Sequence, residues 1–342
     1  MDTDERQTSG ERMPQAEAST MRAVVQHRYG PPDVLGLADV ALPAPGPRDV
    51  LVRVEAASVH PGDYFVVTGT PYIVRLAFGL RRPRHGIPGR DLAGVVVAAG
   101  ADVADVRVGE RVFGWSAEGA LAEFARVPAR TLAPTPDDLT AEQAAAVPTS
   151  AVTALQALRD VGRVRAGQRV LITGASGGVG TFAVQIAKAL GAEVTAVCSA
   201  RNADLVRSLG ADHVVDYATT DFTRTGERYD VILDTVEATS LTAVRRALAP
   251  AGTLVPISGR GGRWIGPLGR VVRTRLLSAF TRQRLRPFTS VGRRADLLAL
   301  AELLGTGQIS PVIDRSFALA DAADALRFVG AGHTQGKVVI TL

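Results

Sequence analysis

Residues Val170–Gly180 read V-L-I-T-G-A-S-G-G-V-G, the pattern of a buried strand that leads into a phosphate-binding turn. Val170–Ile172 is short and aliphatic, as in a strand covered on both faces. Because glycine has no Cβ, such a turn lets a pyrophosphate contact the backbone N–H groups where the next helix begins, and we expect that helix at Thr181–Leu190. The sequence therefore predicts a nucleotide cofactor. We assign its binding to the turn residues Gly174, Ser176, Gly177, Gly178, Val179 and Gly180.

The residues after the next expected strand indicate which nucleotide binds. NAD-selective sites place Asp or Glu there to accept hydrogen bonds from the ribose 2′-hydroxyl. This chain has Ser199 and Arg201 instead, and no acidic residue. A hydroxyl and a guanidinium are suited to a 2′-phosphate, so the sequence predicts NADPH. The alternative is that Arg201 is simply a solvated residue of the following helix.

The elements that must position this turn alternate between strands and helices. Thr140 and Gln143 form a capping-box pattern ahead of an alanine-rich helix. The alternation beyond it is typical of βαβ units and predicts a parallel, doubly wound α/β sheet. The expected strands are Arg169–Thr173, Glu193–Cys198, His213–Tyr217, Asp230–Asp234 and Gly252–Ile257.

The first part of the chain has a different pattern. Met21–Gln26 and Val50–Ala56 alternate apolar and polar residues, as half-buried strands do. Glycine and proline recur through residues 30–136, so we expect short strands and many turns in an antiparallel, barrel-like region. The last segment, Gly336–Leu342, returns to a strand pattern.

A chain of 342 residues is long enough for two domains. We predict a nucleotide-binding domain at 148–284, inserted into a β domain made of 21–147 and 285–342. Residues 1–20 are polar and acidic, which predicts a disordered tail rather than a secretory signal. The single cysteine, Cys198, excludes an internal disulfide framework, and no apolar run approaches the roughly 18 residues that span a membrane. We therefore expect a cytoplasmic protein.

Arginine is concentrated in a region without acidic residues. No Asp or Glu lies between Glu237 and Asp296. Nucleic-acid binding is not favoured, because the arginines are not interleaved with aromatic residues and no reader motif is present. Within this region, the apolar residues of Trp264–Leu285 fall near one helical face. The pattern predicts either weak contact with a membrane surface or a helix that covers the substrate cleft or a subunit interface.

Seven segments, in their order along the chain, resemble the medium-chain dehydrogenase/reductase superfamily, in particular its zinc-free quinone oxidoreductase branch with zeta-crystallin-like proteins. The resemblance covers roughly residues 21–342. It implies a Rossmann doubly wound parallel sheet inserted in a GroES-like, mostly antiparallel β-barrel catalytic domain, and a homodimer. Besides the glycine turn, the segments are Ala57–Asp63, Gly89–Gly94, Val108–Gly114, Ala144–Ala154, Leu209–Tyr217 and Gly336–Ile340.

The resemblance also implies further cofactor contacts. Thr153 matches a threonine beside the nicotinamide, although as a helix residue it has a packing role as its alternative. Tyr217 matches a tyrosine near the adenosine phosphate. We add Lys337, in the terminal motif, to the cofactor-binding residues.

Zinc-dependent members of the superfamily hold a catalytic metal with Cys, His and Cys. The equivalent positions here are His60, Arg90 and Thr149, of which only His60 is a zinc ligand. We therefore predict no metal. Quinones and α,β-unsaturated carbonyls need no Lewis acid, because hydride adds to a conjugated system that delocalises the charge.

Three side chains are candidates for the substrate site. His60 stands where this branch usually has asparagine, as a hydrogen-bond donor to the substrate carbonyl or the nicotinamide ribose. Tyr64, in the same loop, lines the pocket or gives a proton, and Arg90 is the third candidate. Their alternatives are structural: a satisfied loop histidine, a loop held by Asp63, and an ion pair formed by Arg90 and Asp91.

These patterns together predict an NADPH-dependent, zinc-independent reductase of small hydrophobic quinones or α,β-unsaturated carbonyls. Two alternatives stay open. One is an alcohol dehydrogenase, carbonyl reductase or enoyl reductase of the same superfamily. The other is an NADPH-binding redox sensor without turnover.

Overall fold

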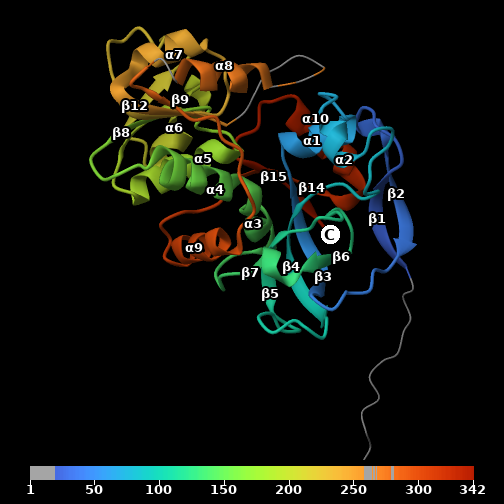
Figure 1. Cartoon of the computed structure of the whole chain (residues 1–342). Helices are drawn as coiled ribbons and strands as arrows, with labels where there is room; N and C mark the ends of the chain where they lie inside the picture. Colours follow the sequence, from blue (N-terminus) through green and yellow to red (C-terminus); the bar gives the residue numbers. More distant parts are fainter. Residues whose placement is uncertain (1–19, 258–263, 265, 267, 279–280) are drawn as a thin grey trace, which may run out of the picture.

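The computed structural model describes residues 20–257, 264, 266, 268–278 and 281–342. The predicted tail at 1–20 therefore lies outside the described residues, except for Thr20. The chain forms two lobes, which Figure 1 shows side by side. We call them the nucleotide lobe, which carries the glycine turn, and the β lobe.

The nucleotide lobe is built on a sheet in which every pair of neighbouring strands is parallel. The order is β10-β9-β8-β11-β12-β13. Counted along the chain, these are the third, second, first, fourth, fifth and sixth strands, the order of doubly wound dinucleotide-binding sheets. The predicted parallel α/β sheet is confirmed. Its strands are β8 (Arg169–Thr173), β9 (Glu193–Cys198), β10 (His213–Asp216), β11 (Tyr229–Asp234), β12 (Leu248–Pro256) and β13 (Arg284–Leu285).

Helices connect and cover these strands (Figure 1). The helix after the glycine turn begins at Gly178, three residues before the expected Thr181, because the end of the turn already forms the first helical turn. The helices are α4 (Pro148–Leu155), continued by a π-helical segment (Gln156–Gly162), α5 (Gly178–Ala189), α6 (Ala203–Ser208), α7 (Leu241–Ala247), α8 (Leu268–Ser278) and α9 (Arg294–Gly305).

The β lobe contains a mainly antiparallel sheet of order β14-β15-β3-β4-β5-β7, with β6 paired to β3. Among the described residues no pairing joins β14 to β7, so the predicted closed barrel is not confirmed. A separate antiparallel pair is formed by β1 (Thr20–Gln26) and β2 (Leu35–Ala41). The other strands are β3 (Asp49–Val59), β4 (Asp91–Ala99), β5 (Arg111–Trp115), β6 (Phe124–Pro128), β7 (Leu132–Pro134), β14 (Ile313–Ala318) and β15 (Lys337–Thr341).

Short helices flank this sheet. The capping box predicted at Thr140 is confirmed, since its side chain accepts a hydrogen bond from the backbone N–H of Gln143. None of the described helices is long and apolar enough to cross a membrane. The helices of the β lobe are α1 (Pro61–Thr68), α2 (Val74–Phe78), α3 (Ala141–Ala145) and α10 (Ala322–Gly330).

The helix expected within Trp264–Leu285 is shorter than the apolar pattern indicated. Residues 265, 267, 279 and 280 lie outside the described residues, and Trp264 precedes α8. Gly266 has a left-handed φ of +53°, and the proline at 267 disfavours helical geometry in the residue before it. The single apolar face is therefore not formed as predicted.

One contact between the two lobes lies where the C-terminal strand enters the β lobe. Gly336, just before β15, forms a parallel β-bridge with Gly177 of the glycine turn. The Gly336 N–H donates to the Ser176 carbonyl oxygen at 2.8 Å. The fold thus brings the turn against the beginning of β15, although the two are far apart in the sequence.

Candidate functional site

The glycine turn lies between β8 and β11, where the direction of strand order reverses. A Cβ on Gly180 would collide with the carbonyl oxygen of Gly174 and with the backbone of Ala175. Gly174 has a φ of +61°, and a Cβ there would run into side chains that follow β11. Gly177 is different, because its nearest neighbour would be a carbonyl oxygen at an ordinary 3.4 Å. The turn is therefore tightly packed underneath and open at Gly177, as a ligand cradle must be.

A buried amide fixes one side of this turn. Asn202 Nδ2 donates to Ser176 Oγ at 2.7 Å, and Asn202 is 6 % exposed. Its Oδ1 is buried without a hydrogen-bond partner in the described part of the chain. Asn202 is not among the predicted site residues, because no local sequence pattern marks a contact between the ends of two different strands.

The residues predicted to select the nucleotide gather at the carboxyl ends of β9 and β10. Ser199 is half-buried and Arg201 is exposed, directly after β9. The Tyr217 N–H donates to the Cys198 carbonyl oxygen at 3.2 Å, which holds the end of β10 beside the end of β9. Within the described chain, the Arg201 guanidinium makes no hydrogen bond or ion pair. This edge of the sheet therefore offers a free cation next to the turn.

A buried ion pair lies beside the turn on the β-lobe side. Lys337 Nζ is 3.8 Å from Asp91 Oδ2, with the two side chains 2 % and 0 % exposed. Burial lowers the pKa of Lys337, and the carboxylates of Asp91 and Asp63 oppose that shift. Lys337 Nζ has no hydrogen-bond partner in the described part of the chain. A Cβ on Gly178 would lie 3.3 Å from Lys337 Cδ, so the side chain passes directly under the glycine turn.

Asp91 is held in place by hydroxyl and amide donors. Thr149 donates to its two oxygens, from Oγ1 at 2.5 Å and from the backbone N–H at 3.2 Å. Trp115 Nε1 in turn donates to Thr149 Oγ1 at 3.2 Å. Ser58 Oγ lies 3.4 Å from the same carboxylate. The orientation of Asp91 is therefore fixed, and its charge partner is Lys337 rather than the neighbouring Arg90 that we expected.

Arg90 itself is exposed. Its carbonyl oxygen accepts a hydrogen bond from the Ser116 N–H at 2.9 Å, and no contact of its side chain with the buried cluster is present among the described residues. The structure therefore does not bring the Arg90 guanidinium together with the other predicted site residues.

His60 caps the N-terminus of α1. Its Nδ1 accepts a hydrogen bond from the Gly62 N–H at 3.0 Å, and its own N–H donates to Asp63 Oδ2 at 2.9 Å. The expectation that Asp63 holds this loop is confirmed. Burial raises the pKa of the Asp63 carboxyl, and the nearby His60 partly opposes that shift. With Nδ1 as acceptor, the neutral imidazole carries its proton on Nε2, which is buried and has no partner in the described chain.

Tyr64 lies one turn along the same helix and lines a cavity of about 460 Å³. A Cβ on Gly330 of α10 would collide with its ring, so the ring packs against that helix. Arg75 bridges two other aromatic rings, with its guanidinium 4.6 Å from the ring of Tyr29 and 4.7 Å from that of Tyr72. Four of the nine residues that line the cavity are therefore aromatic, and one is a cation. Its walls are Tyr29, Gly30, Pro31, Tyr64, Phe65, Thr68, Thr70, Tyr72 and Arg75.

Thr153 is buried in α4. Its Oγ1 donates to the Thr149 carbonyl oxygen at 2.6 Å and lies 2.8 Å from Ser290 Oγ. The threonine therefore links α4 to the segment that follows β13, a contact consistent with its packing interpretation.

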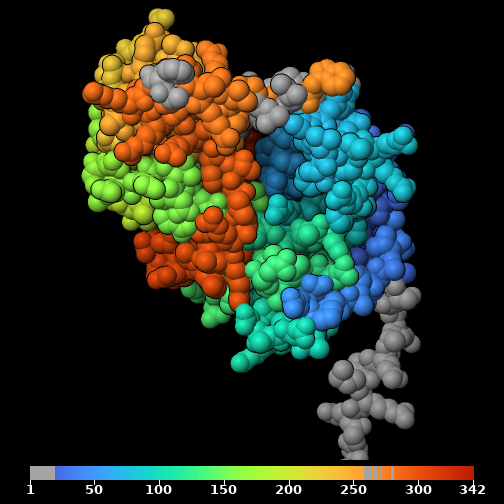
Figure 2. Space-filling model, viewed as in Figure 1, coloured from blue at the N-terminus to red at the C-terminus, as the bar shows by residue number. Residues whose placement is uncertain are grey.

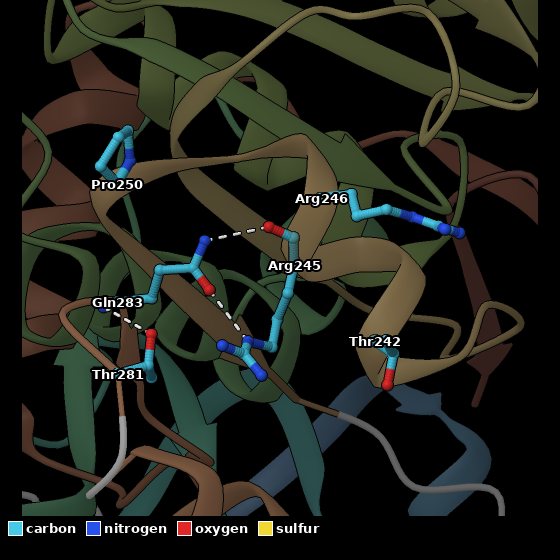
Figure 3. Close-up of a pocket in the computed structure, with 6 residues that line it drawn as sticks. All are labelled: Thr242, Arg245, Arg246, Pro250, Thr281 and Gln283. Atoms are coloured by element: carbon cyan, nitrogen blue, oxygen red, sulfur yellow. Dashed lines mark hydrogen bonds between the residues drawn. The ribbon is translucent and has the colours of Figure 1, made fainter.

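A second cavity, of about 430 Å³, lies beside α7 and the start of β12 (Figure 3). It lies between the end of α7 and the residue pair Thr281 and Gln283, where Gln283 accepts a hydrogen bond from Arg245 Nε at 2.9 Å. Since α7 ends where β12 begins, this cavity is at the amino ends of the strands and away from the glycine turn. Its walls are Thr242, Arg245, Arg246, Pro250, Thr281 and Gln283.

Among the described residues, no group of three or more His, Cys, Asp or Glu side chains is placed to hold a metal ion. Of the three positions that correspond to zinc ligands, Thr149 is engaged with Asp91, and the Arg90 side chain is exposed. The donor set therefore does not fit zinc.

A doubly wound sheet with a glycine turn at its switch point defines a dinucleotide-binding α/β protein. Residues 46–137 match the family model described as alcohol dehydrogenase GroES-like domain, and residues 209–340 match the one described as zinc-binding dehydrogenase. A chloroplastic quinone-oxidoreductase homolog of Spinacia oleracea is 32 % identical, over 94 % of this chain and 99 % of the relative. The mitochondrial NAD(P)H oxidoreductase RTN4IP1 of Mus musculus is 36 % identical, over 96 % of this chain and 90 % of the relative.

A solved structure agrees with these relatives. The quinone oxidoreductase from Coxiella burnetii superimposes with a TM-score of 0.83 at 29 % identity, over 94 % of this chain and 99 % of that one. The chain belongs to the medium-chain dehydrogenase/reductase superfamily, in its quinone-oxidoreductase branch. It is accordingly an oxidoreductase of a family that uses a nicotinamide cofactor.

Proposed function

We propose that the protein is an NADPH-dependent, zinc-independent reductase of small hydrophobic quinones or α,β-unsaturated carbonyls. The observation that carries the proposal is the glycine turn at the switch point, flanked on one side by the unpaired Arg201 and on the other by buried Lys337. The names of the relatives support the class of reaction. We further propose that the protein acts as a cytoplasmic homodimer, as expected from the sequence.

The residues present fit a dinucleotide. The turn is open at Gly177, and Lys337 Nζ is a buried donor without a hydrogen-bond partner in the described chain, so an anion at the turn would satisfy it. Ser199, Arg201 and Tyr217 would hold the adenosine end with its 2′-phosphate. Asp216 pairs with Cys198 at the end of β10, and its Oδ1 accepts a hydrogen bond from the Ala218 N–H at 3.0 Å.

Bound NADPH supplies the hydride, and the chain's own groups orient the substrate and stabilise charge. His60 Nε2–H is the donor available to a substrate carbonyl oxygen, since its Nδ1 is already engaged. The aromatic cavity beside Tyr64 suits a flat conjugated ring. A quinone or enone needs no stronger electrophilic assistance than this hydrogen bond, because conjugation spreads the negative charge that hydride transfer creates, and a proton from water completes the reduction.

The test is to follow NADPH oxidation by its absorbance with an ortho-quinone, a simple enone and an aldehyde, each with and without a chelator. NADPH oxidation that occurs with the quinone or the enone and is unchanged by the chelator supports the proposal. Activity confined to the aldehyde and lost on chelation would contradict it. Tight NADPH binding without turnover of any acceptor would favour the redox sensor.

A further inference from the structure

Large apolar side chains are exposed close together on both sides of the lobe boundary. In the β lobe, Leu76 on α2 and Leu80 just after it are 69 % and 67 % exposed. In the nucleotide lobe, Trp264 is 73 % exposed, and Val272 and Leu276 on α8 are 56 % and 62 % exposed. Soluble proteins seldom gather so many exposed large apolar residues on two neighbouring short segments.

A direct contact joins the two groups. The rings of Trp264 and Tyr72 meet edge to face, with centroids 5.1 Å apart. The Ile73 N–H donates to the Trp264 carbonyl oxygen at 3.1 Å, and a Cβ on Gly266 would touch the Pro71 ring. Figure 1 accordingly places α2 and α8 along the same upper edge of the molecule, one on each lobe. The contact therefore places Trp264 against the segment that leads to Leu76 and Leu80, and we take these residues together with Val272 and Leu276 as one exposed face.

Helix α8 has one side turned inward and one outward. Thr274 is fully buried and Leu277 packs against the core of the nucleotide lobe, three residues apart on one face. Val272 and Leu276, four residues apart, are exposed on another face. Packing against the core therefore accounts for the apolar residues on the buried side of α8, but not for the exposed Val272 and Leu276.

The same two segments carry only positive charge. No Asp or Glu occurs between Asp63 and Asp91, or between Glu237 and Asp296. These four flanking acidic residues are all buried. The exposed arginines around the apolar side chains are Arg81, Arg82, Arg84, Arg273 and Arg275.

We propose that this face, which we call the rim face, docks the protein on the surface of an anionic lipid bilayer. It consists of Leu76, Leu80, Trp264, Val272 and Leu276 with the five arginines named above. Protruding apolar side chains with a tryptophan suit the headgroup boundary, and the uniform positive charge complements anionic headgroups.

The rim face deepens the proposed function, on which this part of the inference rests. Tyr72 supports Trp264 and also lines the aromatic cavity beside Tyr64. Figure 2 shows the surface hollowed along the boundary between the lobes, below this edge. A docked molecule therefore receives its substrate from the bilayer, which indicates hydrophobic quinones dissolved in the membrane as the substrate class.

The direct test is flotation with phosphatidylcholine vesicles, with and without phosphatidylglycerol. We expect binding that requires phosphatidylglycerol and weakens at high salt. Leu76→Ser/Leu80→Ser should weaken it roughly tenfold, because two apolar side chains no longer insert. The control is Val108→Ser, which removes a similarly exposed side chain, 62 % exposed, from the turn between β4 and β5.

A second pair of variants tests how much the arginines contribute to vesicle binding. Arg81→Glu/Arg82→Glu should abolish the preference for phosphatidylglycerol, whereas Arg130→Glu/Arg165→Glu, the same change at exposed positions elsewhere, should keep most of it. Absence of vesicle binding, or equal loss in both pairs, would overturn the proposal. If Leu76→Ser/Leu80→Ser instead converts a dimer to a monomer in sedimentation, the face is a subunit interface and the proposal is wrong.

Activity separates this inference from the proposed function. With a short, water-soluble quinone, the Leu76→Ser/Leu80→Ser variant should reduce the substrate at the same rate as the wild type. With a long-chain quinone held in anionic vesicles, it should lose most of its activity. If neither a quinone nor an enone is reduced, the proposed function fails, while vesicle binding still reports on the rim face.

Discussion

Two of the contacts between the lobes differ in almost every physical respect. At the floor contact, the β-bridge between Gly177 and Gly336 brings backbone against backbone, above the fully buried pair of Asp91 and Lys337. At the rim contact, an exposed Trp264 rests on Tyr72. The floor contact tolerates almost no change in volume or charge, whereas the rim contact consists of side chains that solvent already reaches. We infer that the floor contact fixes the position of one lobe relative to the other. The rim contact contributes little to that position, and its exposed side chains are available to bind a membrane.

The strongest way to break the floor contact is Gly180→Val. Its side chain would collide with the backbone of Gly174 and Ala175, which cannot move aside as a flexible side chain would. We expect a loss of about 4 kcal/mol or more in unfolding free energy, measured by urea denaturation, and no NADPH binding. Gly177→Ala is the matched control, because its Cβ would find ordinary contact distances. It should cost less than about 1 kcal/mol, and an equal loss in both would show that the turn is not packed as described.

The next largest effect should come from Lys337→Met. Removing the ammonium leaves the carboxylate of Asp91 buried without its charge partner, which costs about 3 kcal/mol. The double variant Asp91→Asn/Lys337→Met removes both charges and should recover most of that loss in the same denaturation experiment. A double variant as unstable as the single one would show that the ion pair does not account for the effect.

The floor contact also shows how far the sequence could be interpreted. The strand β8 and the glycine turn were predictable, because aliphatic runs and glycines impose their structure locally. The partnership of Asp91 with Lys337 was not, since it depends on β4 and β15 being placed together by the whole sheet. Arg90 was expected to pair with Asp91 as its sequence neighbour. Consecutive residues of a strand point to opposite sides, however, and β4 begins at Asp91.

The rim contact also shows a limit to what could be predicted from the sequence. The apolar pattern placed Trp264 on one helical face with the residues of α8, whereas Trp264 lies outside that helix and Gly266 between them has a left-handed φ. The pattern also could not show that Leu76 and Leu80 of the other lobe complete the same face. Closure of the β sheet is likewise a property of long-range pairings, which the turn-rich pattern of residues 30–136 does not specify.

A smaller effect is expected at the exposed end of the proposed cofactor site. Arg201→Ala removes a guanidinium that is unpaired in the described chain, so stability should not change. The Kd for NADPH should rise roughly tenfold, about 1.4 kcal/mol, because a charge-assisted contact to the 2′-phosphate is lost. The Kd for NADH, titrated by cofactor fluorescence, should stay the same. Arg165→Ala, at another exposed site on this lobe, is the control, and an equal weakening of both cofactors would remove Arg201 from the discrimination of NADPH.

The smallest effect on stability should follow from Trp264→Ala. Its aromatic contact with Tyr72 contributes roughly 0.5–1 kcal/mol, and most of the indole is already in water. We therefore expect an unfolding free energy within about 1 kcal/mol of the wild type, in contrast to the loss from Lys337→Met at the floor contact. Hydrogen exchange should quicken in residues 71–76 and stay unchanged in β15, because the rim can loosen while the floor holds. If Trp264→Ala destabilises the protein as much as Lys337→Met, the rim contact fixes the lobes as firmly as the floor contact, and the distinction between the two does not hold.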